Sequence, residues 1–144
     1  MPKPLEDLAL AVKWVLKHYE KYLLAGFSAG ANLIAEWGTK HLGYEKYKLQ
    51  APDTMFVVYT FINVSLVQSD KSGDAMCKAM YGKDRKAEEG VVYNVDEHMD
   101  KDYPPCYIVC CEDDDLIPYE NSILMQEKLR VYGDVYKRQS QTSV

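Results

Sequence analysis

Apolar side chains in the first part of the chain recur at spacings of three and four residues. That spacing is typical of one face of an amphipathic helix, and it predicts a helix over about 5–18. The same period returns over 29–40 and over 121–130, and a shorter helix is expected over 75–81.

Three short apolar runs alternate with these helices, at 22–25, 54–60 and 107–110. Each has the length of a buried strand, and the second is rich in the β-branched and aromatic residues that strands favour. Apolar strands that alternate with helices favour a parallel sheet covered on both faces. The predicted fold class is therefore α/β, with one domain over 1–133 and a polar insert at about 68–104 inside it.

The charge balance narrows the partners that the chain can have. Lys and Arg number 17 against 22 Asp and Glu, a net charge of −5, whereas nucleic-acid binding needs a basic surface. We therefore expect no nucleic-acid partner, and no apolar run approaches the roughly 20 residues that span a bilayer. Two acids interrupt the first seven residues, where a signal peptide would be apolar, so a cytoplasmic location is expected.

The cysteines do not form a metal-binding pattern. Cys106, Cys110 and Cys111 lie in or beside an apolar run, Cys77 lies alone, and no pair of Cys-x-x-Cys units exists. We expect buried, reduced thiols that behave as small apolar residues, and no structural zinc.

One pentapeptide, Gly26-Phe27-Ser28-Ala29-Gly30, carries a catalytic pattern. It fits Gly-x-Ser-x-Gly, with a predicted strand before it and a predicted helix after it. Glycines fit the tight turn that holds the serine clear of the sheet edge. The start of the helix favours negative charge, and the N–H of Ala29 would donate to a tetrahedral oxyanion. The alternative is a chance pentapeptide in a turn.

A serine nucleophile needs a base and a carboxylate that orients the base. In the fold that uses this motif, the order along the chain is Ser, then Asp or Glu, then His. The acidic segment 112–118 follows the strand at 107–110, at the end of the sheet where catalytic groups gather. The alternative is a solvated acidic turn before a helix.

With these motifs, the chain resembles the serine esterases of the α/β-hydrolase superfamily, in particular acetyl-xylan-esterase-like carboxylesterases. The resemblance rests on residues 26–33, 102–105 and 112–122. It implies a partial α/β-hydrolase fold, with a parallel sheet flanked by helices. It also implies an ester substrate, either a small molecule or a glycan ester, and no metal or organic cofactor.

The resemblance implies roles for three residues. Ser28 matches the nucleophile of the family, and Ala29 matches the oxyanion residue that follows it. Asp114 matches the triad acid, because it opens an Asp-x-aliphatic-aliphatic-Pro unit, whereas Asp113 and Asp115 are one step out of register.

The chain departs from the family pattern in two ways. The triad histidine should follow the acid, but His18, His41 and His98 all precede Asp114. We expect the first two to be solvated or to cap helix ends, while the third lies in the insert. The loop that supplies a second oxyanion donor is also absent. We therefore expect a fragment without the N-terminal strands and the histidine-bearing segment, nearly inactive by itself and prone to aggregate through exposed sheet edges.

The last eleven residues, 134–144, read as a polar tail without periodicity, where the family has a strand. Residues 134–139 are what the mosaic-end DNA of a library-building transposase would encode, so a non-native tail is expected. Two other functions remain open at this point. One is a non-catalytic α/β module that binds a ligand or partner, and the other is a peptidase related to prolyl oligopeptidases.

Overall fold

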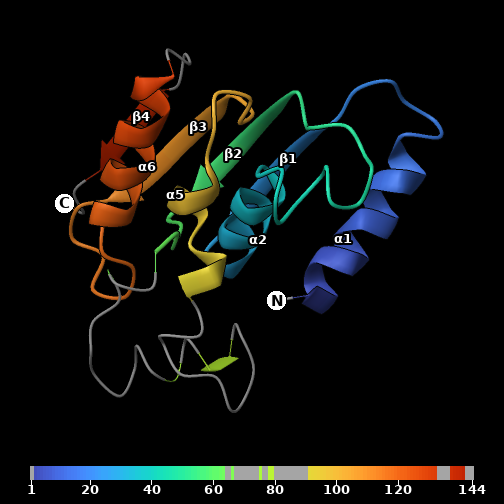
Figure 1. The fold of residues 1–144 in the computed structure, drawn as a ribbon. Helices are drawn as coiled ribbons and strands as arrows, with labels where there is room; N and C mark the ends of the chain where they lie inside the picture. Colours follow the sequence, from blue (N-terminus) through green and yellow to red (C-terminus); the bar gives the residue numbers. More distant parts are fainter. Residues whose placement is uncertain are drawn as a thin grey trace.

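A parallel sheet of four strands forms the centre of the described structure, and its strands lie side by side in chain order (Figure 1). The computed structural model describes residues 2–63, 66, 75, 78–79, 91–132 and 137–141. The strands are β1 (Leu23–Phe27), β2 (Thr54–Val58), β3 (Cys106–Cys111) and β4 (Lys137–Gln141). Each pairs in parallel with the next, so the predicted α/β class is confirmed.

Helices cover one face of this sheet. They are α1 (Pro2–Val15), α2 (Ala29–Trp37), α5 (Val95–His98) and α6 (Glu120–Val131), with the 3-10 turn η2 (Val91–Tyr93) before α5. Figure 1 shows α2, α5 and α6 in front of the sheet, with α1 beside α2. Within the part of the chain that the structure describes, no helix is both long and apolar enough to cross a membrane.

The long predicted helices are confirmed with shifted ends. The first starts at Pro2. Proline has no backbone N–H, but the N–H groups of the first turn have no partner within a helix, so proline is tolerated there. The second ends at Trp37, since the Thr39 hydroxyl accepts the N–H of Leu42 and begins a turn. Of the short helix predicted over 75–81, the structure describes residues 75, 78 and 79, and these three are helical.

The core lies between the sheet and the covering helices. Its members come from α2, β2, α5, β3 and α6, and include Ala31, Ala35, Met55, Val57, Val95, Ile108, Met125 and Leu129. A second cluster joins α1 to α2 through Leu5, Ala9, Val12, Trp37 and Tyr44. Cys106 and Cys110 are buried and unbridged, as predicted, while Cys77 lies outside the described residues.

The opposite face of the sheet carries exposed apolar side chains. Leu23 is 58% exposed, Phe27 59% and Phe56 40%. Phe56 pairs with Tyr107 across β2 and β3, and their ring centroids lie 5.7 Å apart on this same face. We call Leu23, Phe27, Phe56 and Tyr107 the open face. We expected helices on both faces, but none of the described helices covers the open face.

β4 is a strand that the sequence analysis missed. Residues 137–141 pair in parallel with β3, from Tyr107 opposite Lys137 to Cys111 opposite Gln141. We expected a polar tail in place of a strand, and this is wrong for residues 137–141, because strands pair through backbone N–H and C=O groups, which polar residues carry equally. The non-native origin of 134–144 stays a prediction.

Candidate active site

Ser28 occupies a strained turn between β1 and α2. Its backbone has φ 53° and ψ −122°, a region that residues with a side chain rarely adopt and that costs about 1–3 kcal/mol. The Ser28 N–H donates to the carbonyl of Val58 (3.1 Å), and its carbonyl accepts the N–H of Asn32 (3.1 Å). These bonds fix the turn between the end of β2 and the start of α2.

The two glycines of the motif differ in whether the structure has room for a side chain at their position. A Cβ on Gly26 would lie 2.6 Å from the carbonyl carbon of Gly30 and 2.8 Å from the nitrogen of Ala31, so the strand and the helix approach too closely for a side chain. A Cβ on Gly30 would meet no described atom within 4 Å. The expectation that both positions exclude side chains is therefore correct for Gly26 and wrong for Gly30.

The start of α2 leaves polar groups available beside the serine. Ser28 is the N-cap residue, yet its hydroxyl makes no capping hydrogen bond within the described structure. The first intrahelical bond runs from Asn32 N–H, so the helix ladder does not use the N–H of the exposed Ala29. A hydroxyl and an N–H therefore flank the same point at the positive end of a helix dipole.

Asp114 lies in the turn between β3 and α6. Its Oδ1 accepts the N–H of Leu116 (2.9 Å) and of Ile117 (2.8 Å). It is half-buried, whereas Asp113 and Asp115 on either side are exposed. These two bonds leave the Asp114 carboxylate fixed within its turn, which is what a carboxylate that orients a base requires.

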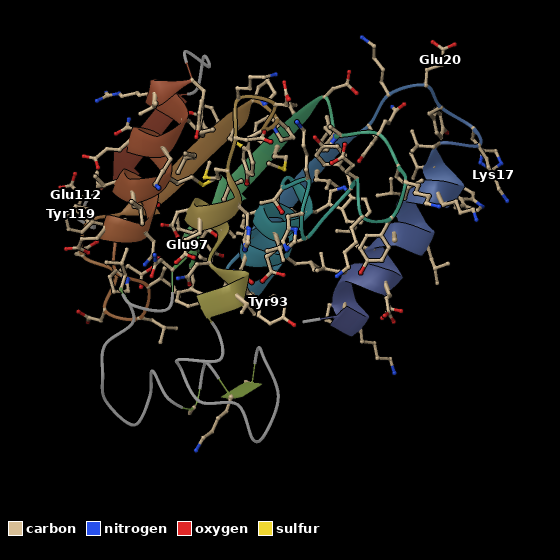
Figure 2. The ribbon with its side chains drawn as sticks, in the orientation of Figure 1. Lys17, Glu20, Tyr93, Glu97, Glu112 and Tyr119 are labelled. Carbon is tan, nitrogen blue, oxygen red and sulfur yellow. The ribbon has the colours of Figure 1, made fainter. Side chains whose placement is uncertain are left out.

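The two candidate residues share one edge of the sheet. Phe27 pairs with Val58, and Val58 pairs with Val109, so the end of β1 lies level with Val109, and β3 continues from there to Cys111. Neighbouring strands lie about 4.8 Å apart, which separates the backbones of Phe27 and Val109 by roughly 10 Å. Figure 2 labels Glu112 and Tyr119, the residues that flank the turn of Asp114.

The three histidines make contacts away from the two candidate catalytic residues. The Nδ1 of His18 lies 2.9 Å from the carbonyl oxygen of Trp14, so this residue caps the end of α1 as expected. His41 and His98 stack on each other with ring centroids 4.9 Å apart, and the Nε2 of His98 lies 2.9 Å from the carbonyl oxygen of Val92. None of these contacts involves Ser28 or Asp114.

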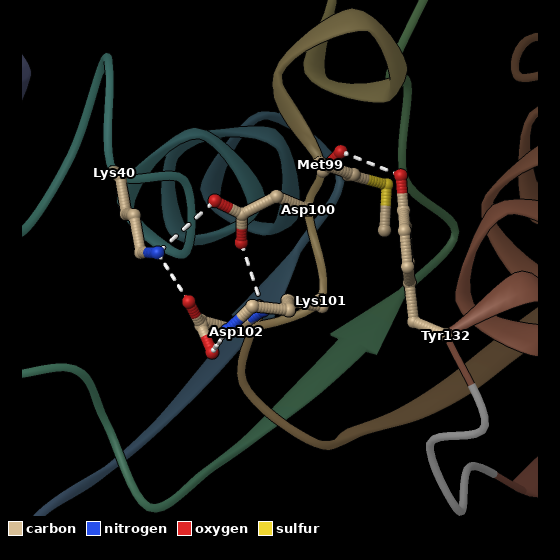
Figure 3. A network of polar contacts seen from close by, with 6 residues as sticks. All are labelled: Lys40, Met99, Asp100, Lys101, Asp102 and Tyr132. Atoms are coloured by element: carbon tan, nitrogen blue, oxygen red, sulfur yellow. Dashed lines mark hydrogen bonds and ion pairs between the residues drawn. The ribbon is translucent and has the colours of Figure 1, made fainter.

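The segment before β3 is held against the end of α2 (Figure 3). Lys40 forms ion pairs with Asp100 (3.2 Å) and with Asp102, which also binds Lys101 (2.7 Å). The Lys101 and Lys40 ammonium groups lower the pKa of Asp102 to about 2. The Tyr103 hydroxyl donates to the buried carbonyl of Ala35 (2.9 Å). In the segment 102–105, which is one of those that carry the sequence resemblance, Asp102 and Tyr103 therefore hold the chain before β3 against α2 and the turn after it.

Two buried polar residues of α2 escaped the sequence analysis. Asn32 donates to the carbonyl of Phe61 (2.7 Å), but among the described residues its Oδ1 has no hydrogen-bond donor and neither carboxylate oxygen of Glu36 has a hydrogen-bond partner. Burial raises the pKa of Glu36 to about 8. Their i, i+4 spacing places both on one side of the helix, which is the one signal that the sequence offers. Among the described residues, no group of three His, Cys, Asp or Glu side chains could hold a metal.

The comparison with protein families decides the identity of this arrangement. Residues 1–129 match the BD-FAE family. The chain belongs to the BD-FAE family. This match and the solved structures confirm an α/β-hydrolase-like fold for this BD-FAE chain.

Two solved structures show the likeness of fold. The carboxylesterase Cest-2923 from Lactobacillus plantarum WCFS1 is 16% identical, with a TM-score of 0.75 over 96% of this chain and 53% of that one. An acetyl ester-xyloside bifunctional hydrolase from Caldicellulosiruptor lactoaceticus is 22% identical, with a TM-score of 0.65 over 83% of this chain and 45% of that one. The BD-FAE chain thus spans about half the length of these structures.

A curated relative shares sequence as well. Endo-1,4-beta-xylanase B from Butyrivibrio fibrisolvens is 26% identical, over 89% of this BD-FAE chain and 22% of that protein. The BD-FAE chain therefore corresponds to about a fifth of a longer polypeptide there.

Proposed function

We propose that this BD-FAE chain carries the nucleophile and the acid of a serine carboxylesterase. Ser28 attacks, Ala29 N–H binds the oxyanion, and Asp114 orients the base. The observation that carries this proposal is the backbone of Ser28, strained at φ 53° at the start of α2 with a hydroxyl that the helix does not use. Strained residues cluster at active sites because only a surrounding structure that fixes them can hold them.

The proposed reaction proceeds through an acyl-enzyme. The Ser28 hydroxyl oxygen bonds to the ester carbonyl carbon while a base takes its proton, and the carbonyl oxygen becomes an oxyanion facing Ala29 N–H. The alcohol leaves with that proton, and water then breaks the acyl bond by the same route. The base is a histidine that we place outside the 144 residues.

The substrate class that we propose is a small-molecule or glycan ester. The names of the relatives support it, since two are carbohydrate-acting hydrolases and one is a carboxylesterase. The chemistry needs no metal or organic cofactor. The cytoplasmic location expected from the first seven residues stays a prediction.

The test uses the enzyme expressed from the full reading frame that contains these residues, with p-nitrophenyl acetate as substrate. We expect Ser28→Ala to abolish turnover and labelling by a fluorophosphonate. Asp114→Asn should lower kcat by about 10⁴-fold, as loss of a triad acid does. The neighbouring variants Asp113→Asn and Asp115→Asn are matched controls and should stay within a few-fold of the parent.

Three results would contradict the proposal. Turnover that survives Ser28→Ala would exclude Ser28 as the nucleophile. Equal losses in all three aspartate variants would remove the special role of Asp114. Ligand binding without any fluorophosphonate labelling would favour a non-catalytic binding module. The 144-residue chain by itself should be nearly inactive, and strong Ser28-dependent turnover by it would place the base inside the chain.

A further inference from the structure

Two segments that are distant in the chain, 61–63 and 95–96, lie side by side. The N–H of Val95 donates to the carbonyl of Ile62 (2.9 Å), and the Asn63 side-chain amide donates to Asp96 Oδ1 (2.9 Å). We call residues 61–63 and 95–96 the insert neck. Hydrogen bonds therefore join these two segments shortly after β2.

Asn121, fully buried at the start of α6, joins this neck to the turn of Asp114. Its Oδ1 accepts the backbone N–H of Ile62 (3.1 Å) and of Asn63 (3.2 Å). Its Nδ2 donates to the carbonyl of Pro118 (3.0 Å), the residue that ends the turn. The backbone N–H of Asn121 donates to the same carbonyl (3.1 Å), so the connection to the neck is the part that depends on the side chain, through its Oδ1.

The other side of the neck is bound to the helix of the nucleophile. Asn32 lies one turn after Ser28, and its side-chain amide donates to the carbonyl of Phe61 (2.7 Å). The backbone N–H of Asn32 also donates to the carbonyl of Ser28. An unbroken set of hydrogen bonds therefore runs from Ser28 through Asn32, the insert neck and Asn121 to Pro118.

We propose that Asn121 is a positioning residue, which sets the turn of Asp114 against the nucleophile helix by way of the insert neck. The inference rests on the proposed function, since it concerns the distance between the proposed nucleophile and acid. The bonds that Asp114 itself makes, to Leu116 and Ile117, shape the turn internally and do not fix it against α2. The two bonds that Asn121 makes to the neck supply that connection.

The first test measures hydrogen exchange in the 144-residue chain. Asn121→Ala removes the acceptor for Ile62 and Asn63, whereas Asn121→Asp keeps an acceptor there; in both variants the backbone N–H at position 121 can still donate to Pro118. We expect Asn121→Ala to make the N–H groups of Ile62 and Asn63, and with them those of Leu116 and Ile117, exchange about tenfold faster, the equivalent of one lost hydrogen bond. Asn121→Asp should protect all four better than Asn121→Ala does. Acceleration of Ile62 and Asn63 alone by Asn121→Ala would overturn the proposal.

The second test measures catalysis in the enzyme from the full reading frame. Asn121→Ala should lower kcat by about 100-fold, the scale of an ångström-sized misplacement, while KM changes less than about threefold. Leu129→Ala is the control, because it removes a buried side chain of α6 far along the helix and lowers Tm without touching the neck. Below its unfolding temperature it should keep the parent kcat.

The outcomes separate the two proposals. If Ser28→Ala is inactive but Asn121→Ala keeps the parent kcat, or loses no more than Leu129→Ala does, the positioning role is wrong and the proposed function stands. If Ser28→Ala stays active, the proposed function itself fails. Should Asn121→Ala not fold, Asn121→Gln keeps both polar ends on a longer side chain, and the same fall of kcat at constant KM is expected.

Discussion

A Cβ atom on Gly26 would lie 2.6 Å from the carbonyl carbon of Gly30, so the end of β1 and the start of α2 meet backbone to backbone. Neither partner in this contact is a flexible side chain that could move aside. The closeness explains how a turn with a strained serine stays fixed, because the backbone on both sides of Ser28 has no room to relax.

The glycine pair gives a matched stability prediction. Gly26→Ala should lower the free energy of unfolding by about 3 kcal/mol or more, since overpacking against backbone cannot be relieved by a rotamer change. Gly30→Ala lies in a helix with open space around it and should raise stability by up to about 1 kcal/mol. Urea unfolding of both variants tests this, and equal losses would show that our account of Gly30 is wrong.

Glu36 gives a pH-dependent stability prediction. Burial raises its folded-state pKa from 4.5 to about 8, so between these values the folded state binds a proton that the unfolded state has released. Stability therefore falls as pH rises from about 4.5 to 8 and levels off above. Glu36→Gln should remove this loss of stability. Its free energy of unfolding should exceed that of the parent by an amount that grows with pH, to about 5 kcal/mol at most by pH 8.

Urea titrations of both proteins at pH 4.5, 6 and 8 would measure the difference for Glu36. The exposed residue Glu127 provides a control on another helix. Because Glu127 is exposed, Glu127→Gln should change the free energy of unfolding by less than about 0.5 kcal/mol. A gain from Glu36→Gln that is the same at every pH would mean that the carboxyl of Glu36 does not titrate in this range.

The open face gives a prediction on self-association. Leu23 and Phe27 are more than half exposed on β1, an edge strand of the sheet. We expect the 144-residue chain to associate in a concentration-dependent way, and Leu23→Lys to weaken that association. Leu10→Lys is the control, because Leu10 is 68% exposed on α1, away from the sheet. Sedimentation velocity that finds a monomer for the parent would contradict the prediction.

The ion pairs of Asp102 give a prediction that carbon NMR can check. The Lys101 and Lys40 side chains lower the pKa of Asp102 to about 2, so this group favours the folded state above about pH 4 and loses that effect as pH falls toward 2. Lys101→Met should raise the pKa of Asp102 more than Lys40→Met does, and both together should return it to the ordinary range. A pKa that neither variant moves would exclude these ion pairs in solution.

The sequence predicted the apolar elements of this fold well and the polar ones poorly. Residues 22–25, 54–60 and 107–110 were recognisable as strands because buried strands are continuous apolar runs. The strand at 137–141 carries no apolar pattern, and only the exposed backbone edge of β3 explains it. An edge of this kind is a property of the sheet and is invisible in the residues that pair with it.

Some residues of the candidate site could likewise be predicted from the sequence, and others could not. Ser28 and the acidic turn were found because their chemistry demands a local motif. Asn121 and Glu36 were not, because an asparagine or a glutamate within a helix has the same sequence signature whether it is buried or exposed. Their significance comes from residues distant in the chain, such as Ile62 and Asn63, which only the folded structure places beside Asn121.

The strand order of the sheet bears on how the protein is made. Since β1, β2, β3 and β4 lie side by side in the order in which a ribosome releases them, each new strand finds its partner already exposed at the growing edge. None of the four described strands has to insert between two others that have already paired. Synthesis halted after any strand would thus leave a smaller sheet with native neighbours, which a pulse of translation arrest followed by limited proteolysis could detect.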